Sequence, residues 1–284
     1  MKRTTLLRSV SSVVLVMLAL TACGSNNNNN GSNPGGGGNP APSPSFSTVA
    51  TGKLTVGSCL DYPPFEDIKK GQQPVGFDIS MVDEIAKRLN LEVKWVKANF
   101  NTIFNAVSAH KFDMVAGAAT ITAARKKIVN FSEPYFSALL SLTVNKDKTP
   151  NITSTDQLKK GDIVGVQKGT TNAIWATKNL APRGIVIKSF ISSPDSFSDL
   201  EAGRITGVIN DLPASVGIVK NRPSLAVVQP IEAGQHYGFA FAPDTPELTI
   251  AVNKAIEAIV ADGTYEKIYH RFFQGPVPKE FQPK

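Results

Sequence analysis

The sequence predicts an α/β protein with two lobes, and two observations support this fold class. From residue 53 onward, short segments that alternate like β-strands are followed by segments with helical spacing, as in βαβ units with a largely parallel sheet. This pattern occurs as two series, one before and one after about residue 145. A chain of 284 residues, of which 42% are hydrophobic, is long enough to form two ordinary cores.

The first 22 residues have the layout of an export signal. An apolar run at 13–20 follows a positive region with three cations, Lys2, Arg3 and Arg8. The run is shorter than the roughly 20 apolar residues that a lasting membrane span needs. It leads into Leu-Thr-Ala-Cys at 20–23, which resembles the lipobox of bacterial lipoproteins. That resemblance implies cleavage before Cys23 and acylation of this residue, and the alternative is an ordinary signal peptide with a chance cysteine.

Residues 23–52 are predicted to form a lipidated cysteine followed by a disordered linker. The stretch is rich in Asn, Gly, Pro and Ser, and it holds too few apolar residues to fold. A flexible chain of about 30 residues spans roughly 30 Å on average, so we expect a tether between a membrane surface and a folded body. Removal of the signal with its three cations lowers the net charge from +7 to +4. This mild excess, without an interleaved aromatic and basic face, does not favour a nucleic acid as partner.

The elements of the two lobes follow from the periodicity of the apolar residues. In the first series we expect strands at 53–58, 91–97 and 113–118 and helices at 78–90, with Asp78 as the N-cap, and at 102–111. In the second series we expect strands at 162–167, 184–190 and 206–211 and helices at 170–180, 193–203 and 213–221.

The C-terminal part of the chain is predicted to return to the first lobe. It contains a strand-like run at 236–242 and two helices within 246–273, which are too few elements for a third domain. The predicted lobes are therefore 53–141 with 237–284, and 142–236. Two crossovers, near 139–144 and 234–238, would form the hinge between them.

The usual signatures of enzymes and metal sites are absent from the sequence. It has neither a G-x-S-x-G motif nor a glycine-rich loop ending in Lys-Ser or Lys-Thr. Its three histidines, His110, His236 and His270, lack metal-ligand spacing, so we expect neither a metal nor another cofactor. Cys59 has no histidine placed to activate it, and we interpret it as a small buried residue at a strand end.

The residues that remain are suited to binding, and several of them follow predicted strands. Open α/β sheets bind ligands at the carboxyl ends of their strands. Tyr62 follows the first strand and is held by the next two residues, which are prolines, and Phe100 follows the second strand. Either aromatic side chain could instead belong to the core, and Tyr62 is favoured as a ligand contact because of its prolines.

The run Thr120–Phe136 places three consecutive cations after a buried strand. Thr122 can cap the turn that begins there, and helix-start N–H groups attract anions. The guanidinium of Arg125 can bind a carboxylate through two parallel hydrogen bonds. We expect Arg125 to contact the anion together with Thr120, and Lys126 and Lys127 to be solvated.

Asp211 supplies the opposite charge at the end of a strand in the second series. It can pair with an ammonium group, cap the helix that follows, or do both. A carboxylate site in one lobe and an ammonium site in the other describe an α-amino acid, whose charged ends are costly to bury unless they are paired. Pairing would then be complete only when the lobes close.

Several motifs together resemble the bacterial extracellular solute-binding proteins for polar amino acids. They are DYPPFED, GFDISMVDEIAKRL, FDMVAGAATITAARKKIVNFSEPYF, GVQKGTTNA, VINDLPAS and DGTYEKIYHRFF, and the resemblance extends over 53–284. It implies a type II periplasmic-binding-protein fold with a hinge of two crossovers. It also implies that the hinge closes around a bound ligand.

The resemblance also implies roles for individual residues. Tyr62 and Phe100 would sandwich the ligand, Thr120 and Arg125 would bind its carboxylate, and Asp211 would bind its ammonium group. It adds three positions, namely a backbone contact at Ala118 and a polar turn at Thr170 and Thr171. Many members have an aspartate three residues before the first aromatic residue. Here that position is Cys59, and Asp61 is out of register by two, so a polar or neutral ligand side chain is favoured.

The function implied by the resemblance is that of a lipid-anchored receptor on the extracytoplasmic face of the envelope. It would bind a free L-amino acid as a monomer and deliver it to an ABC permease in the membrane, without being an enzyme. One alternative is an enzyme that resembles cyclohexadienyl dehydratases on the same fold. Another is a sensor domain that reports amino acids to a different protein.

Overall fold

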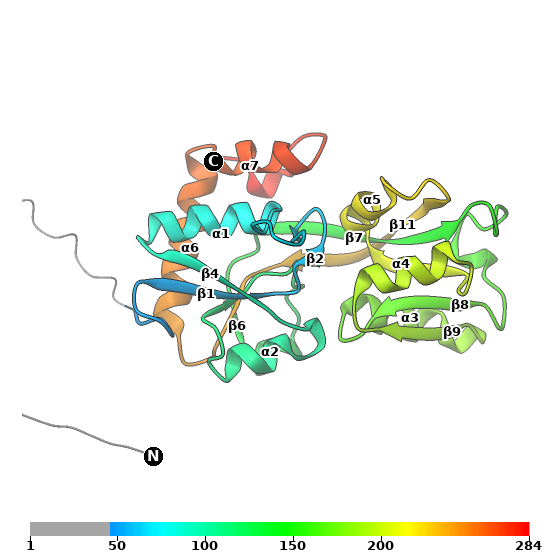
Figure 1. Ribbon diagram of the computed structural model, residues 1–284, viewed down its shortest axis with the longest axis horizontal. Helices are drawn as coiled ribbons and strands as arrows, with labels where there is room; N and C mark the ends of the chain where they lie inside the picture. Colours follow the sequence, from blue (N-terminus) through cyan, green and yellow to red (C-terminus); the bar gives the residue numbers. More distant parts are fainter. Residues whose placement is uncertain (1–45, 284) are drawn as a thin grey trace, which may run out of the picture. The chain divides into compact units, whose positions relative to one another are not determined.

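The computed structural model describes residues 46–283 (Figure 1). The predicted signal peptide, Cys23 and most of the linker lie outside the described residues, as does residue 284. No helix within the described part combines the length and the hydropathy that crossing a membrane requires. Strands and helices alternate along this part of the chain, and the predicted α/β class is confirmed.

The first sheet has five strands in the order β4-β1-β5-β12-β6. These are β1 (Lys53–Ser58), β4 (Glu92–Lys97), β5 (Met114–Val115), β6 (Asn130–Phe131) and β12 (Ala240–Phe241). β1 is parallel to β4 and β5, whereas β12 is antiparallel to β5 and β6. The C-terminal part of the chain therefore returns to the first sheet through β12. A short hairpin of β2 (Asp61–Tyr62) and β3 (Glu66–Asp67) follows β1.

The second sheet also has five strands, in the order β11-β7-β10-β8-β9. These are β7 (Phe136–Asn145), β8 (Ile163–Gln167), β9 (Val186–Phe190), β10 (Gly207–Asp211) and β11 (Leu225–Tyr237). β8 is parallel to β9 and β10, whereas β7 is antiparallel to β10 and β11. Each parallel connection carries a helix, as βαβ units require.

The two crossovers are the ends of β7 and β11, which run side by side between the two sheets (Figure 1). Their register pairs Phe136 with Tyr237 at one end and Asn145 with Leu225 at the other. A shift in register between Ile231 and Gln235 interrupts the pairing in β11. The predicted crossover at 139–144 lies within β7, and the one at 234–238 covers the end of β11 and one residue beyond it. The lobe boundaries at 141/142 and 236/237 stay a prediction.

Helices cover both faces of each sheet, and this explains why the central strands are almost continuously apolar. The helices next to the first sheet are α1 (Phe77–Arg88), α2 (Phe100–Ser108), α6 (Pro246–Ala261) and α7 (Thr264–Phe272). Those next to the second sheet are α3 (Thr171–Asn179), α4 (Ser193–Glu201) and α5 (Leu212–Val219). Four 3₁₀ turns complete the described part, at Arg125–Lys127, Thr155–Gln157, Ala181–Arg183 and Lys279–Phe281.

An aromatic cluster forms the main core of the first sheet and holds the hairpin that leads to the ligand-binding residues. Phe65, between β2 and β3, is fully buried and packs edge-to-face on Phe136 and Tyr237 at centroid distances of 5.1 and 5.4 Å. Such pairs favour this geometry because the positive edge of one ring meets the negative face of the other. This packing therefore fixes the loop beside Tyr62.

The prediction that Asp78 caps α1 is wrong. The helix begins one residue earlier, at Phe77, with Gly76 as its N-cap. Asp78 instead lies fully buried in the first turn and accepts hydrogen bonds from the Ala118 N–H, at 2.9 Å, and the Tyr135 hydroxyl, at 2.8 Å. Its carboxylate thus connects the helix to the loop after β5.

Candidate functional site

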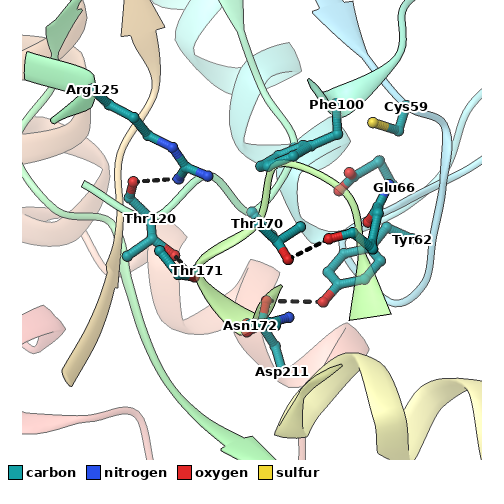
Figure 2. A pocket seen from close by; sticks show the side chains of 13 residues that line it. Cys59, Tyr62, Glu66, Phe100, Thr120, Arg125, Thr170, Thr171, Asn172 and Asp211 are labelled. Atoms are coloured by element: carbon teal, nitrogen blue, oxygen red, sulfur yellow. Dashed lines mark hydrogen bonds between the residues drawn. The ribbon is translucent and has the colours of Figure 1, made fainter. Parts of the chain in front are cut away.

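A cavity of about 340 Å³ lies where the carboxyl ends of strands from the two sheets meet (Figure 2). β1, β4 and β5 lead to it in the first sheet, and β8 and β10 lead to it in the second. All eight predicted ligand-binding residues line this one cavity: Tyr62, Phe100, Ala118, Thr120, Arg125, Thr170, Thr171 and Asp211.

Arg125 is the cation of the cavity. Its side chain is only 9% exposed, whereas Lys126 and Lys127 are exposed to solvent. One guanidinium nitrogen donates to the Thr120 carbonyl at 2.6 Å, and another donates to the Gly169 carbonyl, in the loop after β8, at 3.1 Å. Burial lowers the pKa of Arg125 to about 10, so the group stays charged at neutral pH. Three of its five N–H donors remain for a ligand.

Two phenylalanine rings support the guanidinium. Its central carbon lies 4.4 Å from the centroid of Phe104 and 5.2 Å from that of Phe100. Cation–π contacts at such distances stabilise a desolvated guanidinium. The N-cap of this turn is Ala124 and not Thr122 as predicted, but the Thr122 hydroxyl still accepts a hydrogen bond from the Arg125 N–H at 3.1 Å.

Two threonine hydroxyls, one from each half of the site, meet beside Arg125. Thr120 and Thr171 both donate to the side-chain oxygen of Gln235, at 2.7 and 2.8 Å. Since hydroxyl hydrogens rotate, either can donate to a ligand instead. Thr171 also begins α3, and the Thr170 side chain caps that helix by accepting from the Ala173 N–H. The first N–H groups of α3 and its positive dipole end therefore lie at the cavity.

Asp211 is the counter-charge in the second sheet. It is 5% exposed, and its Oδ2 accepts a hydrogen bond from the Tyr62 hydroxyl at 2.8 Å. Burial raises the pKa of Asp211, while contacts with Tyr237, Tyr62 and Asn172 oppose this rise. The Tyr62 hydroxyl joins the two halves of the site, because its ring belongs to the hairpin after β1.

Ala118 presents backbone to the cavity in a strained conformation. Its φ of +47° lies in the left-handed region that disfavours residues with a Cβ. The Asp78 carboxylate holds the Ala118 N–H, as described above, so the carbonyl is the backbone group of Ala118 left for a ligand. Strain of this kind concentrates at functional sites.

Glu66 is the main residue of the site that sequence reasoning missed. It is 1% exposed on β3 and lines the cavity, and Figure 2 shows it with Cys59 on the side opposite Arg125. The motif DYPPFED contained it, but only the hairpin turns its side chain inward. Asp61, the acid two residues after Cys59, does not line the cavity.

Gln167 and Asn172 are further cavity residues that sequence reasoning did not single out. Cys59 is buried as expected, and burial raises the pKa of its thiol well above the usual range. Within residues 46–283, no group of three or more His, Cys, Asp or Glu side chains is arranged to hold a metal ion.

The two sheets, with a cavity lined from both of them, define the two-lobed type II periplasmic-binding-protein fold. Residues 54–275 match the model of the bacterial extracellular solute-binding proteins, family 3, and the chain belongs to this family.

Among its relatives is the histidine-binding periplasmic protein of Salmonella typhimurium, which is 32% identical over 78% of this chain and 87% of its own length. Among solved structures, an ancestral arginine-binding protein bound to arginine has a TM-score of 0.75 and 36% identity, and it covers 78% of this chain and 99% of that one. An ancestral amino acid-binding protein described as a precursor of cyclohexadienyl dehydratase has a TM-score of 0.72 and 34% identity over 78% of this chain and 96% of that one.

Proposed function

We propose that this protein is the substrate-binding component of an ABC importer and holds one free L-amino acid in the cavity between its sheets. The observation that carries the proposal is the pair of buried opposite charges. Arg125 and Asp211, each less than a tenth exposed, line the same cavity from different sheets. Buried charges are costly unless they are paired. The α-carboxylate and α-ammonium groups of one amino acid would supply a partner for each.

The remaining residues support specific contacts with such a ligand. Thr120, Thr171 and the start of α3 supply donors beside Arg125 for the carboxylate. Tyr62 and Phe100, which are both 7% exposed, supply aromatic walls. The Ala118 carbonyl adds an acceptor for the ammonium group.

We further propose that the ligand side chain is cationic. Glu66 lies opposite Arg125 and therefore faces the far end of a ligand whose carboxylate is bound at Arg125 (Figure 2). The names of the histidine-binding relative and of the arginine-bound structure point in the same direction. This proposal departs from the preference for a polar or neutral side chain that the cysteine at position 59 suggested.

Export, acylation of Cys23 and delivery to a membrane permease complete the proposed function. They rest on the signal layout of the sequence and on the family, which includes a relative named as periplasmic. Changing Cys23 to Ala should move the protein from the membrane fraction to the soluble envelope or medium. Deletion of the gene should reduce uptake of the labelled ligand, whereas unchanged uptake of all amino acids would favour a sensor.

A thermal-unfolding screen of the twenty amino acids tests the binding step. A ligand at a hundred times its Kd adds about 2.7 kcal/mol to the free energy of unfolding, which raises the Tm of a protein this size by roughly 5 to 10 °C. We expect arginine, lysine or histidine to do so. Agmatine, which is arginine without its carboxylate, should not, because it has no partner for Arg125. If no amino acid shifts the Tm, the proposed function is wrong.

The similarity to the precursor of cyclohexadienyl dehydratase keeps an enzyme as a second candidate. Glu66 is a buried carboxyl in the cavity and is the side chain best placed to act as an acid or base. Incubation with prephenate or arogenate, with detection of the aromatic product, distinguishes the two functions.

A further inference from the structure

Glu66 is a buried carboxyl, and one of its oxygens has no partner within the described residues. Its Oε2 accepts no hydrogen bond from any residue in 46–283, and no cation in this range forms an ion pair with it. The other carboxylate oxygen faces Gly117, where an added Cβ would lie 3.3 Å from it. An ionised carboxylate in this position loses its hydration without compensation.

The groups around Glu66 make ionisation still less favourable, because most are acids or neutral donors. The acids are Asp78 on α1, Asp61 on β2, Asp67 on β3 and Asp211 on β10, and the neutral titratable groups are Cys59, Tyr62 and Tyr135. The two cations of the neighbourhood act on other groups: Lys97 lies near Asp61 and Cys59, and Arg125 lies near Asp211. Asp195 on α4 adds a further negative charge near Asp61.

Burial, followed by the repulsion from these acids, raises the pKa of Glu66 well above its usual range. A cationic ligand side chain at this end of the cavity would reverse the balance, because an opposite charge within about 4–6 Å favours the ionised carboxyl. A neutral ligand side chain would leave the pKa of Glu66 raised.

We propose that Glu66 is a proton-exchanging selectivity residue, which releases its proton to the solvent when a cationic side chain binds and keeps it when a neutral side chain binds. This inference rests on the proposed function, because it requires an amino acid in the cavity. In the first case the carboxylate pairs with the guanidinium or ammonium group of the ligand. In the second case the protonated carboxyl can donate a hydrogen bond to an amide or ureido oxygen.

The released proton determines how the affinity for a cationic ligand changes with pH. Below the pKa of Glu66 in the free protein, the affinity for a cationic ligand should rise about tenfold for each pH unit, since one proton leaves on binding. The affinity for a neutral ligand of the same shape should stay nearly flat over that range. Acidic pH therefore shifts the preference of the site toward neutral ligands.

L-Arginine and L-citrulline form a matched pair of ligands for the test. They share their α-groups and side-chain length and differ in charge, so proton exchange at Asp211 or Asp78 cancels when the two are compared. Calorimetry at about pH 6.5 in several buffers of different ionisation enthalpy counts the protons released. We expect arginine to release about one proton more than citrulline.

Two variants assign the proton to a residue. Glu66→Gln should abolish the difference in proton release between arginine and citrulline, because its amide cannot release a proton at this pH. Asp61→Asn, on the same hairpin but outside the cavity, should preserve it even though burial raises the pKa of Asp61 to about 6. Thermal unfolding of both variants checks that they are folded. If citrulline does not bind, the number of protons released by arginine binding is compared between the wild type and Glu66→Gln. The difference between these two numbers then gives the proton contributed by Glu66.

The outcomes separate the inference from the proposed function. If no amino acid binds, the proposed function fails and the inference fails with it. Binding of arginine with no net proton release overturns the inference alone, even if Glu66→Gln is unfolded. The same holds if neutral amino acids bind and cationic ones do not.

Discussion

Arg125 connects the two halves of the cavity through a single side chain. It donates to the Thr120 carbonyl on one side and to the Gly169 carbonyl on the other, with Phe104 beneath it. These contacts fix the plane of the guanidinium in the closed site, which aligns its remaining N–H donors for a carboxylate.

The Arg125→Ala variant should lose most of its ligand affinity. The α-carboxylate would be desolvated without its cationic partner, at a cost of about 2–5 kcal/mol, or roughly thirty-fold to several thousand-fold in Kd. Titration calorimetry with arginine measures the change, and Lys126→Ala, at the adjacent exposed cation, is the matched control. Binding by Arg125→Ala within a few-fold of wild type would refute the carboxylate assignment.

For Asp211→Asn we expect opposite effects on affinity and on stability. The amide keeps the shape of the side chain but leaves the ligand ammonium unpaired, so Kd should rise by at least tenfold, or more than about 1.4 kcal/mol. The free energy of unfolding should not fall, because burial already raises the pKa of Asp211 and the variant removes a desolvated charge. Calorimetry and urea unfolding test the two parts. If the ligand affinity of Asp211→Asn equals that of the wild type, Asp211 does not bind the ammonium group.

The sequence was informative about those site residues whose chemistry is local. Arg125 could be separated from Lys126 and Lys127 because it lies one turn beyond a strand end. Glu66 could not be recognised, since its inward direction depends on a two-residue hairpin packed on Phe136 and Tyr237, which are distant in sequence. Asp78 was misassigned for the same reason, because its partner at Ala118 lies 40 residues away.

At the scale of elements, periodicity predicted the helices and the strands β1, β4, β8, β9 and β10, and it marked β5 and β12 within longer runs. The two longest strands, β7 and β11, were predicted only as crossovers, and β2, β3 and β6 were not predicted. β5, β6 and β12 have two residues each, and they exist because neighbouring strands complete their hydrogen bonds. Such pairings join segments far apart in the chain and leave no local pattern. The apolar run at 113–118 marked β5, but only Met114–Val115 pairs, and the residues after it bend into the cavity.

Helix α5 packs closely against the β2–β3 hairpin at Gly217. A Cβ at Gly217 would lie 3.0 Å from the Pro63 carbonyl oxygen and 3.1 Å from the Pro64 ring. The close approach of α5 to these prolines therefore depends on the missing side chain, and α5 follows directly after Asp211.

The Gly217→Ala variant should therefore be at least as stable as wild type but bind more weakly. Alanine favours the helix over glycine by up to about 1 kcal/mol, whereas its Cβ holds the lobes apart by a few tenths of an ångström. We expect Kd to rise about fivefold, or about 1 kcal/mol. Urea unfolding and calorimetry measure the two quantities. Val216→Ala, at the exposed neighbour, should change neither, and equal affinity of Gly217→Ala and wild type would contradict this contact.

On the scale of the whole molecule, buried acids set the pH dependence of stability. Burial raises the pKa of Asp78 and of Asp61 to about 6, and it raises those of Glu66 and Asp211 as well. In the unfolded chain these groups lose their protons near pH 4. The folded protein thus binds more protons between about pH 4 and 6, and the free energy of unfolding rises as the pH falls through that window. Asp262 opposes this trend only in stronger acid, since Thr264 and Arg88 lower its pKa to about 2.

The protein should therefore have a higher Tm at about pH 5 than at about pH 7.5, contrary to the loss of stability that acid usually causes. Between pH 7.5 and 5, protonation of Asp78 accounts for about 1.4 kcal/mol, because its pKa of about 6 lies one unit above pH 5, and Asp61, which is partly exposed, accounts for less. A total of a few kcal/mol corresponds to roughly 5 to 10 °C. Calorimetric scans of the ligand-free protein across this range measure the shift, and the double variant Asp61→Asn, Glu66→Gln should show a smaller one. A Tm that falls steadily from pH 7.5 to 5 would show that these carboxyls are ionised in the folded protein, and proton exchange at Glu66 would then have no basis.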